Sequence, residues 1–445
     1  MSRETLTGWG RTSPSVANVV TPTSESDVAT HLATAPHVLA RGLGRSYGDA
    51  AQLAGGLILN NRGLGGVSDI NDATGEITVG AGVSIDELLT VIVPRGWFVP
   101  VTPGTRQVTI GGALAADVHG KNHHVDGSIA RHVVSMRLVT PTGVRQLSPE
   151  QSPELFWATM GAMGLTGIIT QVTLRLLRIE TDQILVDTDR FGDLDAVMSA
   201  MASGDENYRY SVAWVDCMTR GRSMGRAILT RGDHATRSDI GSSTLAGPRA
   251  PKLAVPFNAP SGLLNTFTIR AFNELWFRAA PAHRVGEAQR FSSFFHPLDD
   301  VRGWNRLYGS RGFVQYQFVV PDEKADVIAN SIELLAHSKT PSFLAVLKRF
   351  GEANPAPLSF PMRGWTLALD LPVGPSQLPG VLDQLDDLVL EAGGRVYFAK
   401  DSRLDPAKAA AMYPRLEEFR RIKDSVDPHG VLTSDLAQRL KLLRK

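Results

Sequence analysis

Cysteine and long apolar runs are both scarce in this chain of 445 residues. The single cysteine, Cys217, excludes an internal disulfide framework and a zinc site built from cysteines. No run approaches the roughly 18 consecutive apolar residues that a membrane-spanning helix requires. The first residues, MSRETLTGWGRTSPS, contain no apolar core of the kind found in secretory signals. These absences predict a cytoplasmic protein or one attached to a membrane surface.

An excess of charge of one sign is also absent. The formal net charge of +1 gives no electrostatic reason to expect nucleic acid as a partner. Apolar residues make up 43% of the chain, which is enough to fill folded cores. The length is typical of about two or three domains.

The pattern of the chain changes near residue 181. Before this point short strands and helices alternate, with helix-start patterns at Ser24–Asp27 and Ser84–Glu87 and a hairpin pattern over 133–147. After it, longer extended runs dominate. The β-like runs cover 56–60, 66–70, 76–79 and 167–177 in the first part, and 208–215, 312–320, 342–350 and 364–371 in the second.

We therefore predict three parts. Residues 1–181 form a first domain, residues 182–394 a second, and residues 395–445 a C-terminal segment with a short β-run over 395–399 and helices over 414–423 and 433–443. Within the second domain, the stretch 247–281 is rich in proline and has scattered apolar residues. We interpret it as a long lid or mobile segment.

A glycine-rich loop follows the apolar run at the start of Val38–Asp49, which reads VLARGLGRSYGD. Glycine has no Cβ, so such a loop lets backbone N–H groups approach phosphate oxygens. Gly42, Gly44 and Gly48 are spaced one residue wider than the Rossmann fingerprint, and an apolar run over 56–59 follows instead of a helix. The loop therefore predicts a phosphate site in a strand–loop–strand setting rather than an NAD site.

Two further glycine clusters occupy 103–120 and 161–167. Each one alone is compatible with an ordinary tight turn. Together with the first loop they favour a long ligand laid between two small sheets.

Two segments carry the groups suited to catalysis. His119 and His123 have the spacing of helical metal ligands, but Gly120 and Asn122 disfavour a helix and no glutamate follows His119, so we expect no metal. This loop instead favours a histidine and a lysine offered to a ligand. Lys400 follows an apolar run, and burial there would lower its pKa and suit it to act as a base or to bind an anion. The alternative is a solvated lysine paired with its neighbour in sequence, the aspartate at 401.

The motifs RGLGRSYGD, TPGTRQVTIGG, HGKNHH, GAMGLTGIIT and AKDSR resemble the vanillyl-alcohol-oxidase/PCMH superfamily of FAD enzymes over nearly the whole chain. HGKNHH, SVAW, FVQYQF and VYFAKDSR narrow the resemblance to the branch that oxidises the 2′-hydroxyl of decaprenylphosphoryl-β-D-ribose for cell-wall arabinan synthesis. The resemblance implies an α+β fold. Its parts would be a two-subdomain PCMH-type FAD-binding domain, a substrate domain built on an antiparallel sheet flanked by helices, and a C-terminal segment that returns to the FAD domain.

The resemblance also implies the cofactor and its site. Arg45 stands where many relatives carry the histidine that binds flavin covalently, so we expect non-covalent, dissociable FAD. The implied FAD-binding residues are Ala40, Arg41, Gly42, Leu43, Gly44, Arg45, Ser46, Tyr47, Gly48, Asp49, Ala50, Gly104, Thr109, Ile110, Gly111, Gly112, His119, Ile168 and Tyr397.

The catalytic residues implied by the resemblance are Lys400, His119 and Tyr397. Two positions depart from the pattern of the branch: Ala368 replaces a cysteine typical of mycobacterial members, and Thr366 replaces an asparagine. The implied substrate-binding residues are Tyr47, Lys121, Trp214, Gln315, Gln317, Lys348, Phe350 and Lys400.

The resemblance implies partners as well. The substrate would be a polyprenylphosphoryl-pentose, and an NADH-dependent keto-reductase would complete the epimerisation. The stretch 247–281 would make a peripheral membrane contact, and the branch is associated with the periplasmic face of the cell envelope. Two alternatives stay open: an oxygen-using alditol or sugar-lactone oxidase of the same superfamily, and a flavin-binding partner subunit without turnover.

Overall fold

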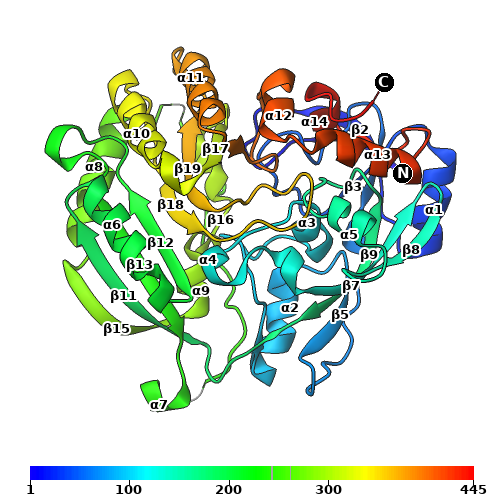
Figure 1. Ribbon diagram of the computed structural model, residues 1–445, viewed down its shortest axis with the longest axis horizontal. Coiled ribbons are helices and arrows are strands. Elements are labelled where there is room, and N and C mark those ends of the chain that lie inside the picture. The colour runs from blue at the N-terminus through cyan, green and yellow to red at the C-terminus, as the bar shows by residue number, and fades with distance from the viewer. Residues whose placement is uncertain (242–243, 261, 445) are drawn as a thin grey trace.

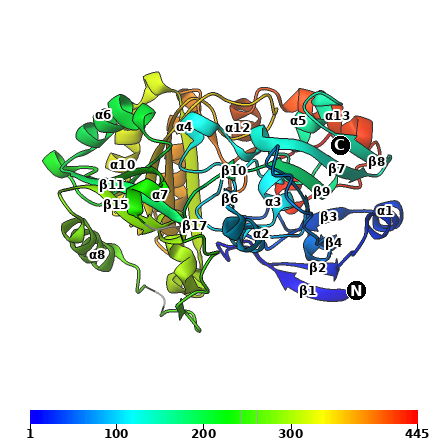
Figure 2. The ribbon, with the colours of Figure 1, turned by 90° about the horizontal axis from the view of Figure 1, so that it is seen from below.

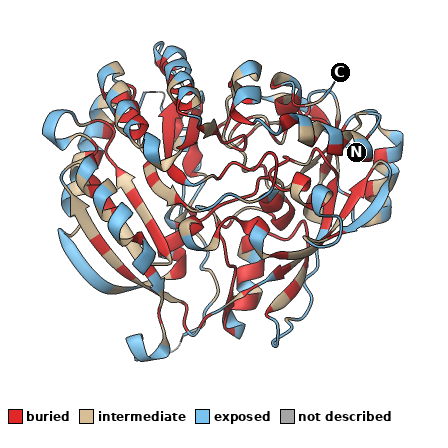
Figure 3. Ribbon diagram, in the orientation of Figure 1, coloured by how far each residue is buried: buried red, intermediate tan, exposed pale blue. Residues whose placement is uncertain are grey.

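The computed structural model describes residues 1–241, 244–260 and 262–444. The chain folds into two halves that lie side by side (Figure 1). One half contains the N-terminal strands together with the C-terminal helices, and the other contains one large sheet with its helices. The loops that run between the halves are largely buried (Figure 3). This arrangement confirms the predicted α+β class.

The first sheet of the N-terminal half is mainly parallel, in the order β1-β2-β4-β3. Helix α1 packs its buried Val28 into the same cluster as Leu57 of β4. The predicted cap at Ser24 is present, but the Asp27 carboxylate accepts from Thr23, so the reciprocal half of the capping box is missing. The elements are β1 (Ser2–Leu6), β2 (Ser15–Val20), α1 (Glu25–Thr34), β3 (Val38–Arg41) and β4 (Leu57–Asn60).

The second sheet is antiparallel throughout, in the order β5-β9-β7-β8, and forms a layer separate from the first (Figure 2). The predicted hairpin over 133–147 is confirmed as β7 and β8, and helix α2 begins with the predicted capping box between Ser84 and Glu87. The elements are β5 (Glu76–Gly80), α2 (Ile85–Ile92), β6 (Trp97–Phe98), α3 (Ile110–Ala115), α4 (His123–Asp126), β7 (Val133–Thr140), β8 (Gly143–Leu147), α5 (Pro153–Thr159), β9 (Ile168–Arg175) and β10 (Leu177–Arg178).

The prediction of a strand over 66–70 is wrong. That stretch makes only an isolated bridge between Val67 and Val79. Gly66 adopts a left-handed backbone conformation, with φ of +101°, which ends regular pairing at this point.

The large sheet is antiparallel, in the order β15-β11-β13-β12-β18-β19-β17-β20. The four extended runs predicted in the second domain are confirmed as β12, β17, β18 and β19, and helices α6 and α11 pack on the sheet. The elements are β11 (Gln183–Phe191), α6 (Leu194–Gly204), β12 (Tyr210–Val215), β13 (Ala227–His234), α7 (Arg237–Ile240), β15 (His283–Arg290), α9 (Phe291–Phe295), β17 (Phe313–Val320), α10 (Asp326–Ser338), β18 (Ala345–Phe350), β19 (Gly364–Pro372), α11 (Leu378–Glu391) and β20 (Arg395–Val396).

The stretch 247–281, interpreted above as a lid, contains a regular helix. Helix α8 (Thr266–Ala279) follows the short strand β14 (Leu253–Ala254), which pairs with β16 (Val301–Arg302); residue 261 lies outside the described residues. Only Ile269 and Asn273 of α8 are buried, and Phe267 is 80% exposed. The helix has no apolar face turned to a core, which is why periodicity did not reveal it. None of the described helices has both the length and the apolar character required to cross a bilayer.

The C-terminal residues pack against the N-terminal half. Leu432 forms a parallel bridge with Val38 and lies in the same buried cluster. The predicted β-run over 395–399 is shorter than expected, because only Arg395 and Val396 pair with another strand. Their partner is β17 of the large sheet, so the predicted boundary between the second domain and the C-terminal segment falls inside that sheet. The helices are α12 (Pro406–Met412), which the sequence did not indicate, α13 (Leu416–Val426) and α14 (Asp435–Arg439).

A backbone junction joins the first glycine loop to the loop that carries Lys400. The Tyr47 N–H donates to the Ala399 carbonyl oxygen at 2.8 Å. A Cβ atom on Gly48 would overlap the carbonyl oxygen of Asp401, so only glycine allows the two backbones to lie this close.

We expect Gly48→Ala to lower stability by roughly 1–3 kcal/mol, because the two loops must separate to admit a methyl group. Thermal unfolding of the purified protein measures the effect. Gly65→Ala is the matched control, since a Cβ at Gly65 meets open space. Equal melting temperatures for the two variants would contradict the close contact.

Candidate active site

A cavity lies where the two halves meet. The first two glycine clusters form one wall, strands β17, β18 and β19 form another, and the loop after β20 also contributes. The third glycine cluster, over 161–167, does not line the cavity. Three segments far apart in the sequence therefore converge on one space. The predicted residues that line it are Gly42, Leu43, Gly44, Arg45, Ser46, Tyr47, Gly104, Thr109, Gly112, His119, Gln315, Lys348, Tyr397 and Lys400.

The first two glycine clusters are packed directly against each other. The Thr109 hydroxyl caps helix α3 by accepting the Gly112 N–H, and a Cβ on Gly42 would overlap that hydroxyl. Gly44 has a left-handed backbone conformation, with φ of +63°. Gly104 has open space at the position of a Cβ. The result is a wall of bare backbone suited to a diphosphate.

Several predicted FAD residues support the loop instead of lining the cavity. Arg41 donates to the carbonyl oxygens of Ala51 at 2.6 Å and Thr7 at 2.8 Å, and Asp49 accepts from Arg439 at 2.8 Å. The others outside the cavity lining are Ala40, Gly48, Ala50, Ile110, Gly111 and Ile168.

Three buried polar atoms in the cavity wall have no hydrogen-bond partner among the described residues, namely Nε of Arg45, Nδ1 of His119 and Oε1 of Gln315. Buried polar groups normally find a partner, so atoms of this kind point to a bound ligand. The Arg45 guanidinium also lies 3.9 Å from the centre of the Trp9 ring. The donor set and the bare loops fit a dinucleotide with a planar ring system.

The tautomer of His119 follows from its neighbours. The Thr366 hydroxyl donates to the Phe318 carbonyl oxygen at 2.8 Å, so it must accept from the Gln317 amide at 2.9 Å. That amide nitrogen then donates to Nε2 of His119 at 3.0 Å. Because burial lowers the pKa of His119 well below its usual range, the ring is neutral and carries its proton on Nδ1.

The environment of Lys400 lowers its pKa to about 7, first through burial and then through the positive charge of Lys348. Burial also lowers the pKa of Lys348, to about 8. The Asp401 carboxylate is bound to Arg439 at 2.8 Å and caps its own turn, so the alternative of a lysine paired with that aspartate is wrong. Lys400 can therefore exchange a proton near neutral pH.

Asp370, on β19, lines the same cavity and was not predicted from the sequence. Its carboxylate accepts from the Gln315 amide and from the Tyr308 hydroxyl, the latter at 3.2 Å. Burial raises its pKa to about 6, against the lowering effects of the Gln315 hydrogen bond and the Lys400 charge. The signal for it was a single acidic residue inside the apolar run GWTLALDLP.

Four predicted substrate residues lie outside the cavity lining. Lys121 donates to the Phe294 carbonyl oxygen at 2.6 Å, and burial lowers its pKa to about 7. The Gln317 amide nitrogen donates to Nε2 of His119, and the Phe350 ring packs edge-to-face with the His119 ring. Trp214 is the register partner of Val346 on the neighbouring strand, and Val346 does line the cavity. Lining residues that were not among the predicted site residues are Trp9, Ala51, Pro103, Thr105, Val108, Ala113, Ala116, Val118, Leu298, Trp304, Leu344, Val346, Ala368, Asp370 and Ala399.

Comparison with known proteins agrees with this geometry. Residues 16–148, which contain the first two glycine clusters, match the FAD binding domain family, and residues 381–440, which contain Lys400, match the D-arabinono-1,4-lactone oxidase family. Over 98% of its length the chain is 46% identical to decaprenylphosphoryl-beta-D-ribose oxidase of Mycolicibacterium smegmatis, of which it covers 97%. The chain belongs to the decaprenylphosphoryl-β-D-ribose oxidase family.

Other relatives are more distant. The chain is 38% identical to an uncharacterized protein of Streptomyces coelicolor, over 81% of this chain and 100% of that protein. It is 23% identical to L-gulono-1,4-lactone dehydrogenase of Mycobacterium tuberculosis, over 95% of each chain. Membership in the decaprenylphosphoryl-β-D-ribose oxidase family makes the protein an FAD-dependent oxidoreductase that acts on a CH–OH group.

We expect the FAD to dissociate intact on denaturation, because the arginine at position 45 offers no nucleophile for a bond to the flavin. Acid precipitation of the yellow protein should leave all flavin in the supernatant, and the mass of the denatured chain should equal that of its sequence. A chain mass increased by that of FAD would contradict this expectation.

Proposed function

We propose that this chain oxidises the 2′-hydroxyl of decaprenylphosphoryl-β-D-ribose to a 2′-ketone. The observation that carries the proposal is the position of Lys400, with a pKa of about 7, in a cavity that also contains the FAD loops and a neutral His119. The identity of 46% to the Mycolicibacterium smegmatis oxidase supports the same substrate.

When bound, FAD supplies the acceptor for the hydride that leaves C2′. Neutral Lys400 takes the proton of the 2′-hydroxyl as the carbonyl forms, so that one hydride and one proton leave the sugar together. The positive charge of Lys348 favours the neutral form of Lys400, because it lowers the pKa of the amine. Asp370 acts in the opposite direction, since its charge raises the pKa of Lys400.

Two further side chains would orient the sugar. Oε1 of Gln315 is buried and has no partner among the described residues, while the amide nitrogen is held by Asp370. This oxygen can accept a hydrogen bond from a sugar hydroxyl. His119 presents its Nδ1–H as a donor. The Tyr397 hydroxyl donates to the Ala116 carbonyl oxygen at 2.7 Å and so fixes the segment of Tyr397 against that of Ala116. Fixed groups of this kind reduce the reorganisation needed at the moment of reaction.

The 2′-ketone needs a second enzyme to become the epimeric alcohol. A reductase that uses NADH, acting on the same lipid-linked ketone, would complete this change. Around α8, the side chains of Leu253, Phe257, Phe267, Leu275 and Trp276 are exposed. Exposed apolar groups beside arginines are typical of contact with a lipid surface, which supports peripheral attachment near the polyprenyl substrate.

The competing activity is that of an alditol or sugar-lactone oxidase. It is favoured by the family match over residues 381–440 and by the lactone dehydrogenase relative at 23% identity. Anaerobic mixing of the holoenzyme with decaprenylphosphoryl-ribose, or with free alditols and sugar lactones, distinguishes the two. Bleaching of the flavin by the lipid-linked ribose alone is expected. Bleaching by the free sugars alone would favour the competing activity, and no bleaching by either would favour a non-catalytic flavin-binding subunit.

We expect Lys400→Ala to keep its FAD and to slow flavin reduction about 10²–10⁴-fold, because the hydroxyl proton loses its acceptor. Lys408→Ala is the control, since Lys408 pairs with Asp387 and does not line the cavity. Stopped-flow absorbance of the flavin measures the rate. Unchanged reduction in Lys400→Ala would remove this lysine from the reaction.

The pH profile gives a separate test. The rate of flavin reduction should rise as pH increases through about 7, where Lys400 loses its proton. Asp370→Asn removes a negative charge that favours protonated Lys400, so the rising limb should move to lower pH. If the pH at which the rate rises is unchanged and only the maximal rate is lower, Asp370 has a purely structural role.

A further inference from the structure

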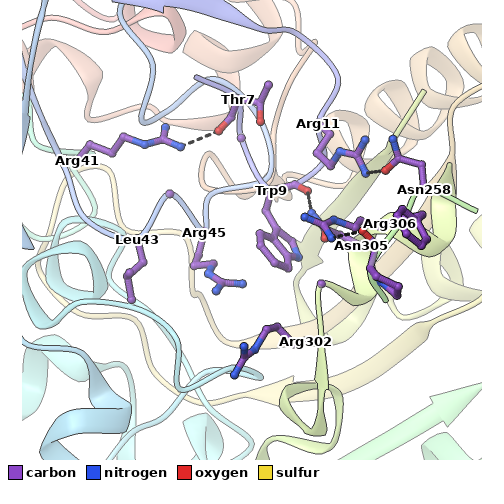
Figure 4. Close-up of a pocket in the computed structure, with 15 residues that line it drawn as sticks. Thr7, Trp9, Arg11, Arg41, Leu43, Arg45, Asn258, Arg302, Asn305 and Arg306 are labelled. Carbon is purple, nitrogen blue, oxygen red and sulfur yellow. Dashed lines mark hydrogen bonds between the residues drawn. The ribbon is translucent and has the colours of Figure 1, made fainter. Parts of the chain in front are cut away.

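A second hollow, of about 800 Å³, adjoins the active-site cavity on the side of the first glycine loop. Figure 4 shows the side chains that line it. Among the described residues that line the hollow, five are arginines and none is an aspartate or a glutamate. They come from three distant parts of the chain and are Arg11, Arg41, Arg45, Arg302 and Arg306.

The charges of these arginines are not neutralised by ion pairs among the described residues. Arg11 donates to the Asn258 side-chain oxygen at 2.8 Å, and Arg306 donates to the Pro256 carbonyl oxygen at 2.7 Å. Both acceptors are neutral. Concentrated positive charge without a counter-charge is suited to bind an anion, and guanidinium groups match the geometry of phosphate oxygens.

Arg45 and Trp9 stand at the junction of the hollow and the cavity, because both residues line both spaces. The ring of Trp9 supports the guanidinium, and Nε of Arg45 is left without a partner. The Asp299 carboxylate interacts electrostatically with this guanidinium, but it already accepts from the Thr105 hydroxyl at 2.6 Å and from the Arg106 N–H at 2.8 Å. Arg45 is therefore available to a ligand that extends from one space into the other.

Two apolar residues also line the hollow. They are Pro256 and Phe257, and Phe257 is 80% exposed. The cavity thus presents backbone and polar groups, and the adjoining hollow presents arginines and an exposed apolar side chain. These surfaces suit a sugar, a phosphate and a hydrocarbon chain.

We propose that the arginine-lined hollow binds the phosphodiester of a lipid-linked pentose whose sugar occupies the cavity. The inference rests on the proposed function, in which the oxidised carbon is adjacent to the carbon that carries the phosphate. Arg45 contacts the phosphate at the junction, Arg302 and Arg306 neutralise it from the outer side, and the polyprenyl chain leaves past Phe257. FAD also carries phosphates, so the cofactor is the other source of an anion at this place.

Titration of the holoenzyme with farnesyl phosphate tests phosphate binding without any oxidation step. Arg302→Gln and Arg306→Gln, alone and together, are compared with Arg222→Gln, which changes an exposed arginine that lines neither space. Loss of a hydrogen bond to a charged group costs about 1.5–3 kcal/mol, so the dissociation constant should rise about tenfold or more in the double variant and not in the control. The dependence of binding on salt should also weaken.

The affinity of each apoprotein for FAD distinguishes the two sources of phosphate. Unchanged FAD affinity together with weaker farnesyl phosphate binding supports the proposal. Weaker FAD binding with unchanged farnesyl phosphate binding would assign the hollow to the cofactor and overturn it, as would equal affinities for farnesyl phosphate in all proteins. If farnesylphosphoryl-ribose fails to bleach the wild-type flavin while the variants lose phosphate binding, the proposed function fails and the phosphate site stands.

Discussion

The site depends on one guanidinium group that ties two loops together. Arg439 donates to the carboxylate of Asp49, at the end of the first glycine loop, and to that of Asp401, beside Lys400. Both contacts are 2.8 Å long, and the Tyr47 N–H adds a backbone bond to the Ala399 carbonyl oxygen. The cofactor loop and the lysine that would act as the base are thereby held in one fixed arrangement. A charged network of this kind restricts geometry more than it adds stability.

Within that arrangement, electrostatics decides what the cavity can do. Lys348 and Lys400 share a buried space with one carboxylate, Asp370, so positive charge is in excess and one amine titrates near neutral pH. His119 is neutral for the same reasons, since burial and then the positive charges of Lys348 and Lys400 lower its pKa. The same excess of positive charge extends outward into the arginine-lined hollow. A substrate that is anionic near its reacting carbon is complementary to both regions.

Some residues line the cavity and others only support the residues that line it. The sequence predicts both kinds but does not distinguish them. Motif resemblance identified Lys400 and His119, because these residues occur in short unusual patterns. It could not separate Gly42, which forms the wall, from Arg41, which anchors the loop to Thr7 and Ala51. It missed Asp370, because a single carboxylate in an apolar strand is uninformative until its neighbours are known. Helix α8 was missed because its apolar side chains face outward.

The sequence by itself determined the local features: the glycines that permit close backbone approach, the cap at Ser84, the extended runs of the large sheet and the absence of a flavin-linking histidine at position 45. These depend on sterics and hydrogen bonds between near neighbours. Only the tertiary structure decided the pKa of Lys400, the tautomer of His119 and the concentration of arginines beside the cavity. Burial and charge sum over groups that the chain brings together from distant positions, so no local pattern contains them.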